Sequence, residues 1–231
     1  MNLQGKKAIV TGVSKGIGNA LVHQLLEKGV TVAGWSRSEP KIKHENFKFF
    51  ATNIADEASV ANAFDESIFY LGGTVDILIN NAGFGLFRTL ENHTSEEWEN
   101  MFAVNVHGIY YTTKRVVPLM KEKQAGHVIN IASIAALQGI NEASGYCGTK
   151  FAVRGISQAL YQEVKKFNVK VTCVMPGSVN TDFFNEAQGI TANPTMLGTA
   201  DIANTMIHIL ETPDNYNTSE IEIRPMSPKY S

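Results

Sequence analysis

Tyr146 and Lys150 combine side-chain chemistry and spacing that suit proton transfer. They stand four positions apart at the start of a long helical pattern, so they project from one helix face, one turn apart. A phenol with a reference pKa of about 10 transfers protons poorly at neutral pH, and a neighbouring ammonium favours the phenolate and lowers that pKa. The pair therefore points to acid–base catalysis. The same spacing also occurs in ordinary helix surface pairs, so its interpretation depends on the rest of the chain.

A glycine-rich turn follows the first predicted strand, residues 7–11. Gly12, Gly16 and Gly18 stand between this β-branched run and a helical pattern, and a second strand is expected at 30–35. Glycines allow a tight turn and a close approach of backbone to a pyrophosphate, whose charge the following helix N-terminus favours. The spacing differs from the G-x-G-x-x-G of the general dinucleotide motif, and a plain tight turn is the alternative. In this setting we expect a dinucleotide-binding turn.

The end of the second strand bears on the choice of cofactor. An acidic residue there would bind a ribose 2′-hydroxyl, whereas a basic one would accept a 2′-phosphate. The strand runs into Ser36 and Arg37 with no acid, and Lys15 in the glycine turn adds a second cation. These residues favour NADP(H) over NAD(H). The alternative is that both cations are solvated surface charges.

The alternation of strands and helices continues along the chain. Further strands are expected at 47–51, 75–80, 127–131, 169–174 and 220–223. Further helices are expected at 57–71, after Thr94 (with Glu97 completing a capping box), and at 106–123, 146–167 and 200–210. This order predicts a parallel sheet with right-handed crossovers. We therefore expect residues 1–231 to form a single doubly wound α/β domain with a parallel sheet of about seven strands.

Composition narrows the class of protein. The net charge of −2 gives no basic footprint, so we expect no nucleic-acid partner. No run of about 18 apolar residues indicates a membrane span, and no signal-like block opens the chain, so we expect a cytoplasmic protein. Two distant cysteines and six histidines without paired ligand spacing predict neither a disulfide framework nor a metal site.

Six motifs in a fixed order carry a family resemblance. They are Thr11-Gly12-x-x-x-Gly16-Ile17-Gly18, Asn80-Asn81-Ala82-Gly83, Asn105, Ser133, Tyr146-x-x-x-Lys150 and Pro176-Gly177-x-x-x-Thr181. From about residue 5 to the final strand the sequence resembles the short-chain dehydrogenase/reductase family. The resemblance implies a Rossmann-type fold. It also makes the Tyr146–Lys150 pair a candidate active site.

The resemblance implies four catalytic roles. Tyr146 would be the general acid in ketone reduction and the base in alcohol oxidation. Lys150 would lower the pKa of Tyr146 and hydrogen-bond the nicotinamide ribose. Ser133 would donate to the substrate carbonyl oxygen. Asn105 would hold a water that links Lys150 to solvent. Ser133 lies in no G-x-S-x-G elbow, so the hydrolase alternative lacks its motif.

The resemblance also implies a set of cofactor-binding residues. Asn81, Ala82 and Gly83 would pass the adenosine ribose, and the segment from Pro176 to Thr181 would border the nicotinamide. Asn53 departs from the family, which often has Asp there against the adenine, and Asn can still make hydrogen bonds. The full set expected is Gly12, Ser14, Lys15, Gly16, Ile17, Gly18, Ser36, Arg37, Asn53, Ile54, Asn81, Ala82, Gly83, Tyr146, Lys150, Pro176, Gly177, Val179 and Thr181.

These observations predict an NADP(H)-dependent oxidoreductase that reduces a small ketone or a 3-oxoacyl thioester to an alcohol. Sugar, alcohol or pterin substrates are the alternative within this class, and a non-catalytic dinucleotide sensor is the alternative outside it. By resemblance, we expect a homodimer or homotetramer joined through the helices at 106–123 and 146–167, and a substrate loop at about 181–197. Four phenylalanines flank the motifs and either line an apolar pocket or anchor loops: Phe84, Phe87, Phe183 and Phe184. We interpret Cys147 as a packing residue.

Overall fold

A parallel β-sheet forms the middle layer of the protein in the computed structural model, which describes residues 1–181, 183 and 195–226. Within these residues the sheet has seven strands, in the order β3-β2-β1-β4-β5-β6-β7. The strands are β1 (Lys7–Thr11), β2 (Thr31–Ser36), β3 (Phe47–Ala51), β4 (Ile77–Asn80), β5 (Gly126–Ile131), β6 (Val169–Pro176) and β7 (Glu220–Ile223). Every neighbouring pair is parallel. The expected doubly wound α/β fold with about seven strands is confirmed.

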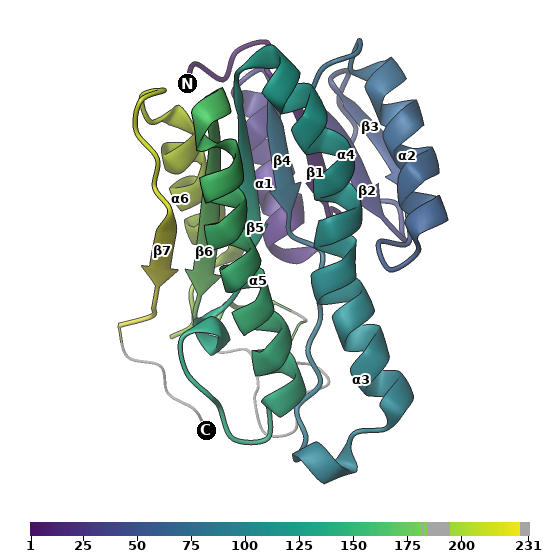
Figure 1. Ribbon diagram of the computed structural model, residues 1–231. Coiled ribbons are helices and arrows are strands. Elements are labelled where there is room, and N and C mark those ends of the chain that lie inside the picture. The colour runs from purple at the N-terminus through teal and green to yellow at the C-terminus, as the bar shows by residue number, and fades with distance from the viewer. Residues whose placement is uncertain (182, 184–194, 227–231) are drawn as a thin grey trace.

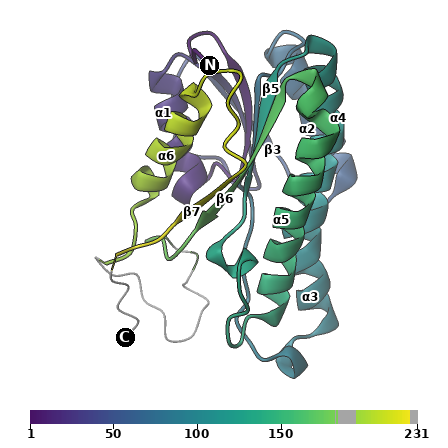
Figure 2. The same cartoon turned by 60° about the vertical axis from the view of Figure 1, so that its left-hand side comes forward.

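Helices cover both faces of the sheet (Figures 1 and 2). One face carries α1 (Gly16–Glu27) and α6 (Thr199–Glu211), and the other carries α2 (Glu57–Tyr70), α4 (Gly108–Lys123) and α5 (Ser144–Val164). Short turns of 3-10 helix span Leu90–Asn92, Ile134–Ala136 and Lys165–Phe167. Because helices lie on both sides, every residue of β5 and β6 is buried. Among the described residues, no helix is both long and apolar enough to cross a membrane.

The strand order reverses between β1 and β4. From β1 the chain moves outward through β2 to β3, and then returns to pair β4 with the opposite side of β1. The loops that follow β1 and β4 therefore leave the sheet side by side, at the carboxyl ends of two adjacent strands. In doubly wound sheets this switch point is where ligands bind.

The helix α3 (Ser95–Phe102) extends beyond the carboxyl ends of the strands (Figure 1). Its predicted capping box is confirmed: Thr94 Oγ1 accepts from the Glu97 N–H at 3.1 Å, and Glu97 accepts from the Thr94 N–H at 3.0 Å. The continuation differs from the expectation, because a π-helical turn at Ala103–His107 joins α3 to α4. The helix expected at 106–123 is thus the end of a longer helical segment with a bulge near Asn105.

Candidate active site

Each glycine of the turn after β1 meets a steric demand. Gly12 and Gly16 have φ of +72° and +65°, a region that side chains with a Cβ rarely adopt. A Cβ on Gly18 would lie 2.3 Å from the carbonyl oxygen of Gly12, so α1 packs directly on the turn. The N-cap of α1, Lys15, makes no side-chain capping hydrogen bond, and the first turn holds no acid. The N-terminal N–H groups of α1 thus suit an anionic ligand.

Asn81 fastens the glycine turn to the loop after β4. Its Nδ2 donates to the carbonyls of Thr11 at 3.0 Å and Gly12 at 3.1 Å. In return, Thr11 Oγ1 accepts the N–H groups of Asn81 and Ala82, each at 3.0 Å. The Asn81 side chain is therefore engaged in holding the two loops together, a structural use that the sequence motif did not reveal.

The residues expected at the adenosine end follow β2 and β3. Arg37 is exposed, and Ser36 Oγ donates to the Ser38 carbonyl at 2.7 Å. Asn53 Oδ1 accepts the Ala55 N–H at 3.2 Å, which shapes the loop before α2. Ile54 packs against Gly108, where a Cβ would lie 2.8 Å from Ile54 Cγ1. Asn53 and Ile54 thus have structural partners in the protein, while the Arg37 side chain faces solvent.

Tyr146 is buried near the start of α5, with 7% of its surface exposed. Burial raises the pKa of its phenol to about 12, and a hydrogen bond with Ser133 opposes that rise. Ser133 caps the short helix after β5, where its hydroxyl accepts the Ala135 N–H at 3.2 Å. The structure therefore brings two of the predicted catalytic hydroxyls together.

Lys150 is buried one turn further along α5 and is 5% exposed. Its Nζ donates to the Ile131 carbonyl at 3.0 Å and lies 5.6 Å from the centroid of the Tyr146 ring. Burial lowers the pKa of this ammonium to about 8. Burial thus raises the pKa of the phenol while the Lys150 ammonium is directed at Ile131, and the role of Lys150 in lowering the pKa of Tyr146 stays a prediction.

Asn105 lies in the π-helical turn and connects three parts of the site. Its Nδ2 donates to the Phe84 carbonyl at 2.8 Å and to Thr149 Oγ1 at 3.0 Å, and its Oδ1 accepts the Phe84 N–H at 3.0 Å. Both amide protons are therefore engaged with the protein. A water relay at Asn105 would have to use an acceptor, such as its backbone carbonyl.

Thr149 is a site residue that the sequence reasoning missed. Its hydroxyl accepts from Asn105 and donates to the Tyr146 carbonyl at 2.8 Å, so it joins the π-helical turn to the first turn of α5. Gly83 lies against the same cluster, because a Cβ there would be 3.1 Å from Asn105 Oδ1 and 3.6 Å from Lys150 Nζ. The position of Thr149 in the sequence, between Tyr146 and Lys150, could have indicated that it belongs to the site.

The segment after β6 reaches back to the glycine turn. Gly177 donates its N–H to the Ile223 carbonyl at 2.7 Å, and Val179 forms an isolated bridge with Leu197. Thr181 then lies over the turn, 3.6 Å from a Cβ placed on Gly16. Most of the predicted substrate loop, residues 182 and 184–194, lies outside the described residues, and so does Phe184.

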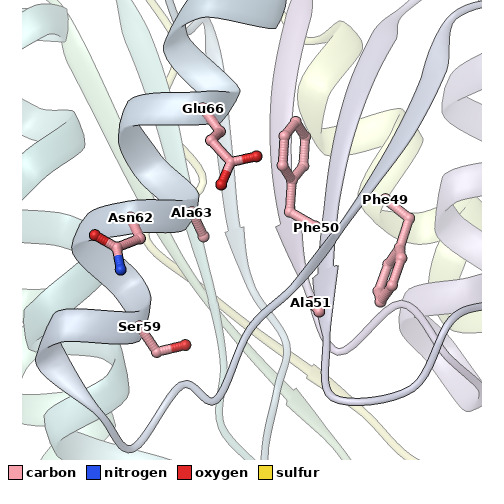
Figure 3. Close-up of a pocket in the computed structure, with 7 residues that line it drawn as sticks. All are labelled: Phe49, Phe50, Ala51, Ser59, Asn62, Ala63 and Glu66. Carbon is pink, nitrogen blue, oxygen red and sulfur yellow. The ribbon is translucent and has the colours of Figure 1, made fainter.

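A separate groove lies at the opposite edge of the sheet (Figure 3). It has a volume of about 390 Å³ and runs between β3 and α2, where the side chains of Ser59 and Glu66 point toward the strand and Asn62 also lines the groove. Its remaining lining residues are Phe49, Phe50, Ala51 and Ala63. The groove does not include the Tyr146–Ser133 pair, so we place the candidate active site at the carboxyl ends of β4 and β5.

The predicted residues fall into two groups at the carboxyl ends of the strands. Ser133, Tyr146, Lys150, Asn105 and Gly83 gather at the end nearest β5, while the glycine turn, Asn81 and Thr181 occupy the switch point. A buried phenol near a glycine turn at the switch point is typical of Rossmann-type oxidoreductases, in which the cofactor carries the hydride chemistry and the protein orients it.

Comparison with known proteins agrees with this class. The family model described as short chain dehydrogenase matches residues 6–189. An uncharacterized oxidoreductase of Staphylococcus aureus (strain MRSA252) is 35% identical over 234 residues, with 97% of this chain and 99% of the relative covered. One from Staphylococcus saprophyticus is 33% identical, with 98% and 100% covered. The chain belongs to the short-chain dehydrogenase family and is an oxidoreductase.

Solved structures match nearly the whole fold. An alcohol dehydrogenase from the archaeon Thermococcus sibiricus, complexed with 5-hydroxy-NADP, has a TM-score of 0.88 at 27% identity and covers 97% of this chain and 99% of its own. A 3-ketoacyl-(acyl-carrier-protein) reductase from Brucella melitensis, complexed with NADH, also has a TM-score of 0.88, at 24% identity, with 97% and 98% covered. The latter likeness concerns the fold alone.

Proposed function

We propose that the protein is a cytoplasmic, NADP(H)-dependent reductase that converts the carbonyl of a small ketone or a 3-oxoacyl thioester into an alcohol. The observation that carries the proposal is the buried Tyr146 phenol, hydrogen-bonded to Ser133, at the carboxyl end of the sheet where the glycine turn also lies. The phenol is protonated at neutral pH and so holds the proton that reduction needs, and the neighbouring Lys150 ammonium would ease its transfer.

The proposed reaction divides the work between cofactor and protein. The bound dinucleotide would supply a hydride to the carbonyl carbon. Ser133 would donate a hydrogen bond to the carbonyl oxygen, and Tyr146 would transfer its proton to that oxygen as negative charge develops there. Lys150, with a pKa near 8, can exchange a proton close to neutral pH and so return one to Tyr146. Asn105 would support this exchange through a water.

The glycine turn and the start of α1 support binding of a dinucleotide. The positive-φ glycines and the N-terminus of α1 suit the pyrophosphate. For this dinucleotide we propose adenosine contacts from Ser36, Arg37, Asn53, Ile54 and residues 81–83, and nicotinamide contacts from Pro176, Gly177, Val179 and Thr181. Ser14, Lys15, Ile17, Tyr146 and Lys150 complete the proposed set.

The preference for NADP(H) rests on charge at the end of β2. Arg37 and Lys15 are exposed cations there, and no acid follows Trp35 in the strand. Structural neighbours carry both kinds of cofactor, one complexed with 5-hydroxy-NADP and the other with NADH, so the choice depends on this chain's own residues. A guanidinium suits a 2′-phosphate through paired hydrogen bonds.

Cofactor affinities measured by calorimetry test this preference. We expect wild type to bind NADPH more tightly than NADH, and Arg37→Ala to weaken NADPH binding by about 10-fold or more while leaving NADH unchanged. Lys121→Ala, at the far end of α4, is the control and should change neither affinity. Equal affinities of the wild type for the two cofactors would refute the preference.

Turnover distinguishes the reductase from a cofactor sensor. NADPH absorbance followed with a panel of ketones, 3-oxoacyl thioesters, sugars and pterins should fall with members of the first two groups. Tight NADPH binding without oxidation by any member of the panel would favour the sensor. Selective oxidation with sugars or pterins would favour the alternative substrates.

We also propose a homodimer or homotetramer joined through α4 and α5. Tyr110 on α4 and Phe151 on α5 are large apolar side chains that remain 57% and 45% exposed. Light scattering should give a mass at least twice that of the chain, and Phe151→Glu should lower it. A monomeric wild type would contradict this assembly.

A further inference from the structure

The ring of Tyr146 packs against two phenylalanines from distant parts of the chain, which also pack against each other. Phe87, in the segment after β4, lies 5.5 Å from the Tyr146 ring centroid at an interplanar angle of 48°. Phe183, in the segment after β6, lies 5.6 Å away at 55°. The two phenylalanine rings are 6.4 Å apart and meet edge to face at 80°. We call the rings of Phe87, Phe183 and Tyr146 the aromatic cage.

Small and apolar residues complete the surroundings of the cage. Gly85 touches it directly, since a Cβ there would lie 2.9 Å from Tyr146 Cδ2 and 3.1 Å from Phe183 Cζ. Met101, Ala135 and Ala143 are buried in the same cluster. With Tyr146 only 7% exposed, a substrate that reaches its hydroxyl must take over part of the contact that these rings now make with one another.

Charged groups near the cage are engaged elsewhere. Arg88, the neighbour of Phe87 in sequence, forms an ion pair with Glu97, with 3.0 Å between Nη2 and Oε1. Lys150 directs its ammonium at the Ile131 carbonyl. Among the described residues, the polar side chains that act on the Tyr146 phenol are the Ser133 hydroxyl and the Cys147 thiol. In the described part of the chain the cage therefore combines one polar pair, Tyr146 and Ser133, with apolar side chains around it.

This arrangement discriminates between classes of carbonyl compound. A carbonyl oxygen would find partners in Ser133 and Tyr146, but hydroxyl or carboxylate groups on the adjacent carbons would meet Phe87 and Phe183 and lose their hydrogen bonds to water. An aryl or branched alkyl group would instead pack against Phe87 and Phe183, and so make up for the contacts between the rings that its entry disrupts. A substrate whose polar groups lose their hydrogen bonds on binding is disfavoured relative to one that has no such groups, and this difference sets the specificity.

We propose that Phe87 and Phe183 are specificity-determining residues and that the substrates are ketones bearing an aryl or branched alkyl group directly on the carbonyl carbon. This inference rests on the proposed reductase function and narrows it, because polyols and sugars are disfavoured. The contact surface comes from two loops, after β4 and after β6, that the fold brings together over α5.

The wild-type test compares three ketones with NADPH: acetophenone, acetone and dihydroxyacetone. Acetone and dihydroxyacetone share a carbon skeleton and differ by two hydroxyls, so they isolate polarity from size. We expect kcat/KM for acetophenone to exceed that for acetone by about 100-fold, and dihydroxyacetone to be the poorest of the three. A kcat/KM for dihydroxyacetone equal to or above that for acetone would overturn the proposal.

Variants assign the selectivity to the cage. Phe87→Ala and Phe183→Ala should each raise KM for acetophenone by about 10-fold while kcat for this ketone and kcat/KM for acetone change little. Phe87→Leu, which keeps an apolar side chain in place, covers the case in which the alanine variant folds poorly, and should have an intermediate KM. Phe69→Ala, 90% exposed at the end of α2, is the control. Unchanged KM in Phe183→Ala and Phe87→Leu would overturn the proposal.

The proposed function and the cage can fail separately. Absence of NADPH oxidation with all three ketones would contradict the reductase. Calorimetry of the wild-type protein with NADPH would then still decide the cage: binding of acetophenone but not of dihydroxyacetone supports it, and the reverse order refutes it.

Discussion

Burial governs the protonation of the two central residues, Tyr146 and Lys150. Both side chains are almost fully removed from water, and burial favours the neutral form of each: it raises the pKa of the phenol to about 12 and lowers that of the ammonium to about 8. Lys150 finds one hydrogen bond, to the Ile131 carbonyl. Tyr146 is therefore a neutral phenol, and the charged form of the neighbouring Lys150 is destabilised by burial.

Lys150→Met should stabilise the protein while abolishing turnover. The pKa of Lys150 is lower in the folded state than its unfolded value of 10.5, so the unfolded state binds this proton more tightly. Burial of the charged lysine therefore lowers the free energy of unfolding, and this loss is at its maximum below about pH 8. After allowance for the lost hydrogen bond to Ile131, we expect a gain of about 1–3 kcal/mol at pH 7. Urea unfolding measures it.

The pH dependence gives this prediction its check. The stability gain of Lys150→Met should shrink as pH rises from 8 through 10.5, where the wild-type lysine becomes neutral in both states. Lys166→Met, at an exposed position, should show no such trend. A less stable Lys150→Met variant at pH 7 would mean that the ammonium contributes more than its burial costs.

Structural elements that depend on residues close together in the sequence were predicted correctly. The capping box at Thr94 depends on residues three apart, and the glycine turn on residues whose φ only glycine adopts readily, so both were readable from the sequence. The π-helical turn at Asn105 was not. The π-helical turn accompanies hydrogen bonds from Asn105 to Phe84 and Thr149, which are 21 and 44 positions away. The hydrophobic periodicity of the helix does not predict partners so distant in the sequence.

A buried amide network joins the sheet to α4 and α5 and was also missed. Asn80 Nδ2 donates to Asn130 Oδ1 at 2.8 Å, and Asn130 Nδ2 donates to Ser157 Oγ at 2.9 Å. Thr112 Oγ1 donates to Asn80 Oδ1 at 2.6 Å. In the sequence Asn80 belongs to one of the six motifs, whereas Asn130, Ser157 and Thr112 are marked by no pattern. In the fold they connect β4 and β5 to the helix that carries Tyr146.

Asn130→Ala should therefore be strongly destabilising. It leaves the Asn80 amide and the Ser157 hydroxyl without a shared partner in a site that excludes water, and such losses cost about 2–4 kcal/mol together. The free energy of unfolding in urea measures the loss. Gln158→Ala removes an exposed hydrogen bond to Glu220 and should cost under about 1 kcal/mol. Equal effects of the two changes would contradict the network's role.

The order of strands in the whole molecule determines which loops meet. Alternating strand and helix patterns predicted a parallel sheet, because crossovers of that kind allow little else. They did not give the order 3-2-1-4-5-6-7, since a strand's pattern does not state its neighbours. That order is what places the loops after β1, β4, β5 and β6 next to one another at one end of the sheet, and it also brings Phe183 onto Tyr146.

His127 should make the whole fold sensitive to acid. It lies fully buried in β5, with its Nε2 2.8 Å from Thr172 Oγ1, and burial together with the Lys170 ammonium lowers its pKa to about 3. The unfolded state therefore takes up this proton first, so the stability that depends on neutral His127 is complete above pH 6.5 and is lost as pH falls towards 3. The loss at pH 5 should be about 2 kcal/mol.

Urea unfolding at pH 7.5 and pH 5 tests this contribution. The difference between the two pH values should be about 2 kcal/mol smaller in His127→Gln than in wild type. His23→Gln, at an exposed position on α1, should leave the difference unchanged. Identical acid dependence in wild type and His127→Gln would rule the histidine out as its source.

The central claim is that Tyr146 donates the proton in an NADPH-dependent carbonyl reduction, and Tyr146→Phe tests it most directly. Turnover of the best ketone and NADPH affinity should be measured together, with Tyr161→Phe on the same helix as the control. We predict that kcat falls by about 1,000-fold or more in Tyr146→Phe, that its NADPH affinity stays within about 3-fold of wild type, and that Tyr161→Phe resembles wild type in both. Retention of wild-type turnover by Tyr146→Phe would contradict the account.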